Sequence, residues 1–248
     1  MKTEKKRCVG CNKCIFCCPT NANNALLEDM ENKIHVDETM CISCGACIDI
    51  CDHDARFVED DTERFLTDLQ KGKQISLIAA PSIKHNIEEY ERLFGYLKSK
   101  GVNVFYDVSL GADITTWGYI RAAQEQNISS MIASPCPVIV EYIERFKPEL
   151  IASLAPIHSP AICIAIYMKK YMNITDEIAF LSPCLGKSKE IVDENTHGYV
   201  GYNITYSGIL KHLEAGNIDL CDYEQQQFDN IDGGLGLAFS RPGGLCEN

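Results

Sequence analysis

Two short stretches near the N-terminus decide how the first part of this chain folds. Residues 8–19 read CVGCNKCIFCCP, and residues 41–51 read CISCGACIDIC. In both stretches three cysteines are separated by two residues each, and a fourth follows after three more. Three thiolates at this spacing can bind three corners of an iron–sulfur cubane from one tight loop, while the fourth reaches the other cubane. The repeated spacing therefore predicts a small unit that holds two [4Fe–4S] clusters.

This crossed arrangement assigns the eight cysteines to two sets of four, each drawn from both copies of the repeat. The first set is Cys8, Cys11, Cys14 and Cys51. The second set is Cys41, Cys44, Cys47 and Cys18. Structural zinc and disulfides remain as alternatives, although zinc favours separated cysteine pairs and disulfides need an oxidising compartment. Cys17 is extra to the pattern and is expected to be a buried thiol beside a cluster.

The segment resembles a bacterial two-cluster ferredoxin, including Pro19 directly after the first cysteine run. In the second run Asp52 stands at the corresponding position. A module this small has little apolar core, so we expect the clusters to hold it together and the apo form to be poorly folded. The resemblance implies that electrons pass in series through two neighbouring clusters.

The composition of the whole chain argues against several other classes of protein. Of the 248 residues, 46% are hydrophobic and 23% are charged, as in folded globular proteins. The formal net charge of −12 argues against binding to nucleic acid or to an anionic membrane surface, because both need clustered cations. No apolar run reaches the length of a membrane span, and the charged start lacks the apolar region of a signal peptide. We therefore expect a cytoplasmic protein.

Beyond a first domain over residues 1–60, the sequence predicts an α/β domain with a mostly parallel sheet. Residues 61–74 are rich in charge and are expected to form a linker or a surface helix, followed by the α/β domain over 75–248. Short apolar runs alternate with stretches of helical periodicity, which predicts helices on both faces of the sheet. The expected strands are 75–79, 102–106, 130–133 and 178–181. The expected helices are 87–97, 112–126, 138–146 and 161–171.

Three turns at the ends of expected strands carry the chemistry of this domain, because open α/β sheets bind ligands beyond the carboxyl ends of their strands. These turns are Ala80-Pro81-Ser82, Ser134-Pro135-Cys136-Pro137 and Ser182-Pro183-Cys184. Cys136 and Cys184 each precede an expected helix, whose N-terminus favours the thiolate that a metal needs. Lys187 adds a cation to the same crevice. The residues leave open whether this is a third metal or cluster site or a pair of buried structural cysteines.

Residues 75–215 resemble the catalytic domain of iron-only ([FeFe]) hydrogenases. The likeness lies in the two cysteine motifs, in residues 141–150, in His158-Ser159-Pro160 and in Ala80-Pro81-Ser82. The resemblance implies an active centre in which a [4Fe–4S] cubane is bridged by a cysteine sulfur to a di-iron unit. It implies that Cys136 and Cys184 are two ligands, and that Lys187 donates a hydrogen bond to a cyanide. It also implies catalytic roles for Lys187 and Ser159 and a di-iron pocket lined by Ala80, Pro81 and Ser82.

Two departures from the family pattern bear on activity. Pro135 occupies the position of a cysteine that relays protons in the family. The family's third motif, which supplies the last two cysteine ligands, is not found before Asn248, and Cys246 lacks its context. With two of four ligands we do not expect the hydrogen-activating centre to assemble as in the family, whether the chain is a fragment or the domain has lost the chemistry.

The leading hypothesis is an iron–sulfur protein for electron transfer or redox sensing, with a ferredoxin-like redox protein as its donor or acceptor. The alternative is an iron-only hydrogenase, or a fragment of one, that reversibly reduces protons to H2. A third hypothesis is a module whose clusters only brace the fold. His158 is the histidine of most interest, and Cys163 and Cys221 are expected to pack as small apolar side chains.

Overall fold

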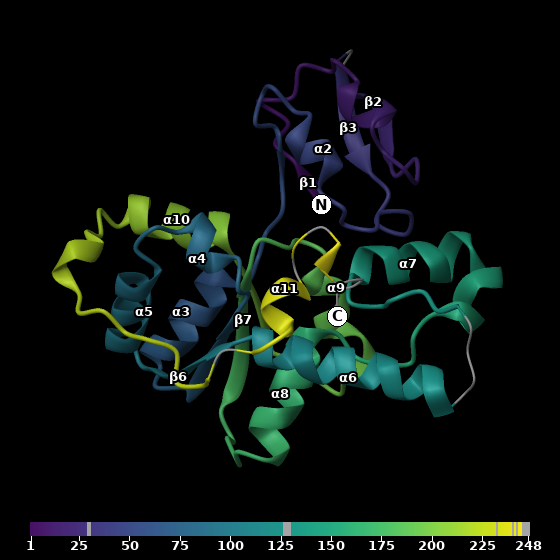
Figure 1. The fold of residues 1–248 in the computed structure, drawn as a ribbon. Helices are drawn as coiled ribbons and strands as arrows, with labels where there is room; N and C mark the ends of the chain where they lie inside the picture. Colours follow the sequence, from purple (N-terminus) through teal and green to yellow (C-terminus); the bar gives the residue numbers. More distant parts are fainter. Residues whose placement is uncertain (29–30, 126–129, 232, 240, 242, 245–248) are drawn as a thin grey trace. The chain divides into compact units, whose positions relative to one another are not determined.

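The chain folds as two units, Met1–Glu59 and Asp60–Asn248 (Figure 1). The computed structural model describes the chain apart from residues 29–30, 126–129, 232, 240, 242 and 245–248, so Cys246 lies outside the described residues. Among the described residues, no helix combines the length and the apolar character that a bilayer-spanning segment requires.

The first unit consists of short elements arranged around cysteines. In chain order they are β1 (Lys2–Thr3), α1 (Lys13–Phe16), β2 (Asn23–Glu28), β3 (Glu31–Val36), α2 (Ala46–Asp49) and β4 (Arg56–Phe57). Strands β1 and β4 pair antiparallel, and β2 and β3 form an antiparallel hairpin. The buried apolar cluster of this unit is Cys8, Cys14, Ile34, Cys47 and Ala55. Three of its five members are thiols, so the unit has very little hydrocarbon core.

The sequence repeat of the first unit is also a backbone repeat. Left-handed backbone conformations fall at corresponding positions of the two copies, namely Gly10 and Ser43, Asn12 and Gly45, and Asn21 and Asp54. These residues turn the chain around each cysteine loop. Gly10 also has no room for a side chain, because a Cβ atom there would lie 2.5 Å from the carbonyl oxygen of Asn32. The loops are therefore fixed by backbone geometry as well as by cysteine spacing.

The second unit is built on a parallel sheet, as the sequence predicts. Its strands are β5 (Ile75–Ala79), β6 (Val102–Asp107), β7 (Glu177–Ser182) and β8 (Tyr202–Thr205). They lie in the order β6-β5-β7-β8, and every neighbouring pair is parallel. Three of the four expected strands, 75–79, 102–106 and 178–181, correspond to β5, β6 and β7.

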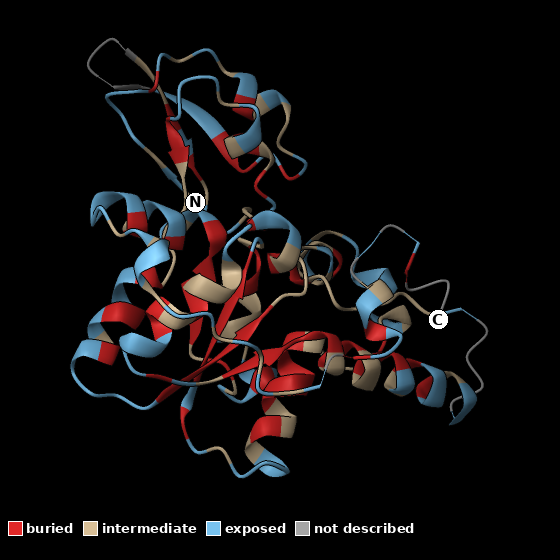
Figure 2. Cartoon of the chain, turned by 60° about the vertical axis from the view of Figure 1, so that its left-hand side comes forward, coloured by how far each residue is buried: buried red, intermediate tan, exposed pale blue. Residues whose placement is uncertain are grey.

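Helices cover both faces of this sheet. The α-helices are α3 (Thr62–Gln70), α4 (Ile83–Asn86), α5 (Tyr90–Ser99), α6 (Ser109–Glu125), α7 (Pro137–Phe146), α8 (Pro160–Lys170), α9 (Lys187–Val192), α10 (Tyr206–Ala215) and α11 (Gly236–Phe239). The 3-10 helices are η1 (Pro148–Ser153), η2 (Glu194–Thr196) and η3 (Leu220–Asp222). Leu77 packs with α3, α5 and α10 on one face, and Ile78 packs with α8 on the other. Figure 2 shows the resulting buried layer along the sheet.

The fourth expected strand, 130–133, does not form, and this expectation is wrong. Ile132 makes a single parallel bridge to Leu154, with backbone hydrogen bonds to Ser153 and Ala155. The ladder ends there because the next backbone donor, the Ser134 N–H, binds the Tyr119 hydroxyl at 3.1 Å. The Ser134 hydroxyl faces the strand carbonyl in its place. The one hydrogen of this hydroxyl is shared between the carbonyl oxygens of Ala155 and Ile157, each 2.9 Å from the hydroxyl oxygen. The turn that contains Cys136 therefore begins from a loop and not from the end of a sheet strand.

Residues 61–74 belong to the second unit. Of the two expectations for this stretch, the helix forms and the linker does not. The stretch contains α3, whose Phe65, Leu66 and Leu69 are buried among the residues that cover the sheet. The start of α3 is tied to β8, because the Asp61 carboxylate accepts a hydrogen bond from the backbone N–H of Asn203 at 2.8 Å. The abundant charges of this stretch lie on the outer face of the helix. They dominate its composition, so the apolar face is not recognised from the sequence.

Candidate metal centres

Two small cavities in the first unit are each surrounded by four cysteines. One is lined by Cys8, Cys11, Cys14 and Cys51. The other is lined by Cys18, Cys41, Cys44 and Cys47. These are the two sets that the spacing predicts, each with three thiols from one copy of the repeat and one from the other. Within the described part of the chain, no three His, Cys, Asp or Glu side chains converge as a single metal ion would require.

The pKa values of the thiols around these cavities bear on whether the thiols can act as metal ligands. Burial raises the pKa of the Cys14 thiol to about 11, so without a bound cation this group stays neutral near pH 7. Burial also acts on Cys18, but hydrogen bonds from the Thr20 and Ala22 backbone outweigh it and lower the pKa of that thiol. The Ala22 N–H lies 3.2 Å from the Cys18 sulfur. Four thiols around a cavity are the donor set of an iron–sulfur cubane, and the residues present fit that group.

Cys17 lines neither of these cavities. Its thiol is half-buried, and its sulfur lies 3.5 Å from the carbonyl oxygens of Cys14 and Ala46. Burial raises the pKa of this thiol. Cys17 is therefore placed as a packing thiol between the two cysteine loops.

In the second unit, two of the three predicted turns flank the point where the strand order reverses. The chain passes from β5 to β6 on one side and returns to β7 on the other side of β5. The turn Ala80-Pro81-Ser82 follows β5, and Ser182 ends β7 directly before Pro183 and Cys184. Such reversal points are where open α/β sheets bind ligands. Ala80, Pro81 and Ser82 therefore lie at the expected place for a site.

Tyr206, at the start of α10, supports the first of these turns. Its hydroxyl lies 2.9 Å from the Ser82 hydroxyl and 3.3 Å from the Ala80 carbonyl oxygen. Burial raises the pKa of the Tyr206 phenol to about 12. Nothing in the sequence marks Tyr206 as a site residue, because its role depends on the pairing of β8 with β7.

Replacing Tyr206 by phenylalanine is expected to change stability in a pH-dependent way. The folded state favours the protonated phenol, so its contribution is complete below about pH 10 and is lost as the pH rises toward about 12. At pH 8 we expect Tyr206→Phe to be less stable by about 1 kcal/mol, because its hydrogen bonds are lost. At pH 11 the difference in the free energy of unfolding between the two proteins should close. Urea denaturation of both proteins at the two pH values measures this, and a gap that does not change with pH would contradict it.

Lys187 joins three segments that the sequence places far apart. It is 8% exposed, and its ammonium group donates to the Pro135 carbonyl oxygen at 3.2 Å and to the Ser159 hydroxyl at 3.0 Å. It also forms an ion pair with Glu190 at 2.6 Å. The turns that contain Cys136 and Cys184 are therefore brought together, and Ser159 lies beside them. Lys187 and Ser159 were predicted site residues; Glu190 was not, although its spacing of three residues from Lys187 on a helix is a recognisable signal.

Gly186 brings the two cysteine turns into close approach. Cys136 occupies the N-cap position of α7, and Pro137 is the first residue of that helix. A Cβ atom on Gly186 would lie 2.5 Å from a methyl carbon of Val138 and 3.8 Å from the Cys184 sulfur. Only glycine lets the Cys184 turn pack so closely against the start of α7.

A Gly186→Ala substitution is therefore expected to lower the free energy of unfolding by about 1–3 kcal/mol, the usual range for an overpacked position. Gly234→Ala is the matched control, because a Cβ atom there would meet nothing nearer than the Asp113 carboxylate at 3.9 Å. Urea denaturation compares the two variants. Equal loss in both would show that the approach at Gly186 is not tight.

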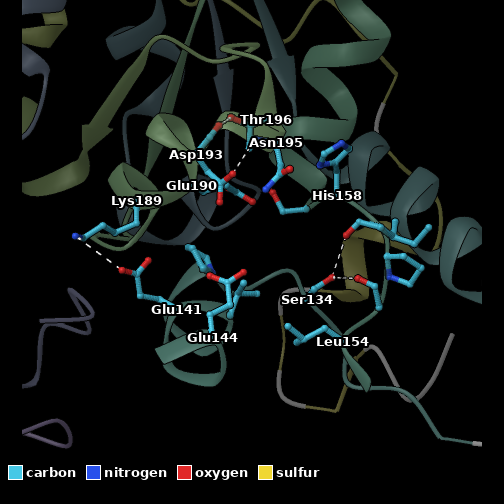
Figure 3. Close-up of a pocket in the computed structure, with 16 residues that line it drawn as sticks. Ser134, Glu141, Glu144, Leu154, His158, Lys189, Glu190, Asp193, Asn195 and Thr196 are labelled. Atoms are coloured by element: carbon cyan, nitrogen blue, oxygen red, sulfur yellow. Dashed lines mark hydrogen bonds and ion pairs between the residues drawn. The ribbon is translucent and has the colours of Figure 1, made fainter. Parts of the chain in front are cut away.

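A cavity of about 320 Å³ lies between α7, α9, η2 and the loop before α8 (Figure 3). Its wall includes Ser134, Ser159 and His158, together with the carboxylates of Glu141, Glu144, Glu190 and Asp193. Burial, and then the charges of Asp193 and Glu141, raise the pKa of Glu144. Cys136 and Cys184 are half-buried and do not line this cavity.

The two remaining cysteines of the second unit that the structure describes differ from one another. Cys163 is buried, with its sulfur 3.4 Å from the His158 carbonyl oxygen, in agreement with a packing role. Cys221 lies exposed in η3, so the expectation that it packs as a small apolar side chain is wrong. The 3-10 turn keeps its backbone at the surface, where the Asp219 carboxylate accepts its N–H.

Fold and cysteine arrangement together define an iron–sulfur protein with a hydrogenase-like second unit, and comparisons with known proteins agree. Residues 73–248 match the family described as "Iron only hydrogenase large subunit, C-terminal domain". Residues 1–52 match the family "4Fe-4S dicluster domain". The chain therefore belongs to the family defined by the C-terminal domain of iron-only hydrogenase large subunits, and it carries a 4Fe–4S dicluster domain at its N-terminus.

Individual relatives are distant. The chain is 23% identical to the nuclear prelamin A recognition factor of Xenopus laevis over 88% of this chain and 56% of that protein. It is 24% identical to the factor of the same name from Homo sapiens over 73% of this chain and 48% of that protein. The chain thus spans about half the length of the curated relatives it matches. A solved variant of an [FeFe]-hydrogenase from Chlamydomonas reinhardtii shares the fold, with a TM-score of 0.60 and 21% identity over 76% of this chain and 56% of that chain.

Proposed function

We propose that this protein transfers electrons or senses redox state through two [4Fe–4S] clusters in its first unit. The observation that carries the proposal is the grouping of eight cysteines into two sets of four, each around its own cavity. By this proposal Cys8, Cys11, Cys14 and Cys51 hold one cluster. Cys18, Cys41, Cys44 and Cys47 hold the other. Bound clusters supply one-electron redox chemistry, and a redox protein is the partner that such a unit needs.

We further infer that the second unit is a hydrogenase-like scaffold without a competent hydrogen-activating centre. A cubane takes four thiolate ligands, and in the described part of this unit only Cys136 and Cys184 lie in the turns that Lys187 and Gly186 bring together. Beside Cys136, Pro135 offers a carbonyl oxygen and no transferable proton. This donor set does not fit a fully ligated cubane bridged to di-iron, so we assign no catalytic step to it.

Anaerobic reconstitution of the full chain tests the first part of this proposal. About eight irons and a matching amount of sulfide per chain are expected, together with the EPR signals of reduced [4Fe–4S] clusters. Zinc in place of iron, or about four irons after complete reconstitution, would contradict it. About twelve irons would instead show that Cys136 and Cys184 take part in a third cluster.

Hydrogen evolution with reduced viologen tests the second part. The reconstituted chain is expected to evolve no hydrogen above the background of a cluster-free sample. Sustained turnover would overturn the non-catalytic assignment in favour of the alternative, an iron-only hydrogenase that reduces protons to H2.

A further inference from the structure

Arg56 places a buried positive charge between the two cysteine sets. It lies on β4, is 4% exposed, and lines the cavity of Cys8, Cys11, Cys14 and Cys51. One of its terminal nitrogens lies 3.6 Å from the sulfur of Cys47, which belongs to the other set. The same nitrogen donates to the Asn23 side chain at 2.7 Å. The guanidinium therefore reaches both sites from one position.

Two features of this arginine remain unexplained by packing alone. Its Nε–H is buried and has no hydrogen-bond partner among the described residues. Its other contacts are the side chains of Thr3, Asn23 and Cys47, and no carboxylate in the described part of the chain pairs with it. A buried, unpaired cation and an unused donor are both costly. An anionic cluster in the adjacent cavity would supply the missing negative charge and sulfur acceptors for the free N–H.

We infer that the buried charge of Arg56 raises the reduction potentials of both clusters; this inference rests on the proposed function. Reduction adds an electron to a group that is already negative, and a nearby cation stabilises the product more than the reactant. Hydrogen bonds to cluster sulfurs act in the same direction. Because the guanidinium stays charged at all accessible pH values, its effect does not depend on pH.

Redox titration of the reconstituted full chain, followed by EPR or by protein-film voltammetry, tests this inference. At a fixed potential near the midpoint, Arg56→Gln is expected to lower the ratio of reduced to oxidised cluster about tenfold, a shift of about 59 mV to more negative potential for a one-electron couple. The shift should be the same at pH 6.5 and pH 8.5. Arg56→Lys keeps the charge and should retain most of the wild-type potential.

Arg7→Gln is the matched control, because it removes the same charge from an exposed position next to Cys8. Water and salt screen that charge, so its effect on the ratio of reduced to oxidised cluster should stay below about threefold.

Iron content separates the two proposals. A wild-type chain that takes up no clusters contradicts the proposed function, whereas a fully loaded Arg56→Gln chain with unchanged potentials overturns the role of Arg56. If Arg56→Gln does not hold its iron, the Arg56→Lys chain decides. A loaded Arg56→Lys chain whose ratio of reduced to oxidised cluster differs tenfold from wild type would overturn the role of the Arg56 charge, and a ratio within threefold of wild type would support that role.

Discussion

Removal of iron is expected to unfold residues 1–59 and to leave residues 60–248 folded. Among the described residues of the first unit, the buried apolar cluster consists of Cys8, Cys14 and Cys47 with Ile34 and Ala55, and the other apolar side chains that pack against it are only partly buried. We therefore expect the clusters to replace a hydrocarbon core. The second unit has two extensive apolar clusters on its sheet and needs no metal for its core. Hydrogen exchange of the full chain before and after chelation should show protection lost in the first unit alone. Retained protection there would show that its fold does not depend on clusters.

Two cysteine variants give this prediction a matched pair. Cys14 lines the first cavity, and Cys17, three residues further on, lines neither. Cys14→Ser is expected to lose roughly half of the bound iron and much of the exchange protection in the first unit. Cys17→Ser should retain both. Equal losses in the two variants would mean that the cavities do not mark the ligand sets.

Some parts of this molecule could be predicted from the sequence because their causes are local or periodic. Cysteine spacing predicts the two sets, since a tight loop can present three thiols only to one cubane, and the same eight cysteines line two separate cavities. Short, mostly apolar runs marked β5, β6 and β7, because strands of a parallel sheet that is covered by helices on both faces are largely buried. The run at 130–133 has the composition of a strand, but the Ser134 N–H, which would continue the ladder, donates to the Tyr119 hydroxyl.

Other parts depend on contacts between distant segments and left no local signal. Arg56 reads as an ordinary charged residue until the pairing of β1 with β4 places it between the cysteine cavities. Tyr206 supports the Ser82 turn because β8 joins the far side of β7. Charge density at 61–74 suggested solvent exposure, whereas the three buried apolar residues of α3 follow helical spacing beneath it. Topology decides these roles, and spacing within one segment does not reveal topology.

Loss of the Lys187 ammonium is expected to be the most damaging single change in the second unit. Lys187 and Glu190 form an ion pair whose side chains are nearly buried, so Lys187→Met leaves an uncompensated carboxylate. Removing one partner of a buried ion pair lowers the free energy of unfolding by about 3–5 kcal/mol. It also removes the donor that holds the Pro135 carbonyl and the Ser159 hydroxyl. The free energy of unfolding of the second unit, measured by urea denaturation, should fall accordingly.

Lys189→Met is the matched control on the same helix. Its side chain is 32% exposed and lies 4.0 Å from Glu141, so its loss should cost less than about 1 kcal/mol. Replacing Glu190 by leucine in the Lys187→Met background should recover much of the stability, because the carboxylate is then no longer buried without a partner. If Lys187→Met costs no more than Lys189→Met, Lys187 does not hold the cysteine turns together. In that case the close approach at Gly186 would have to position Cys136 and Cys184 without it.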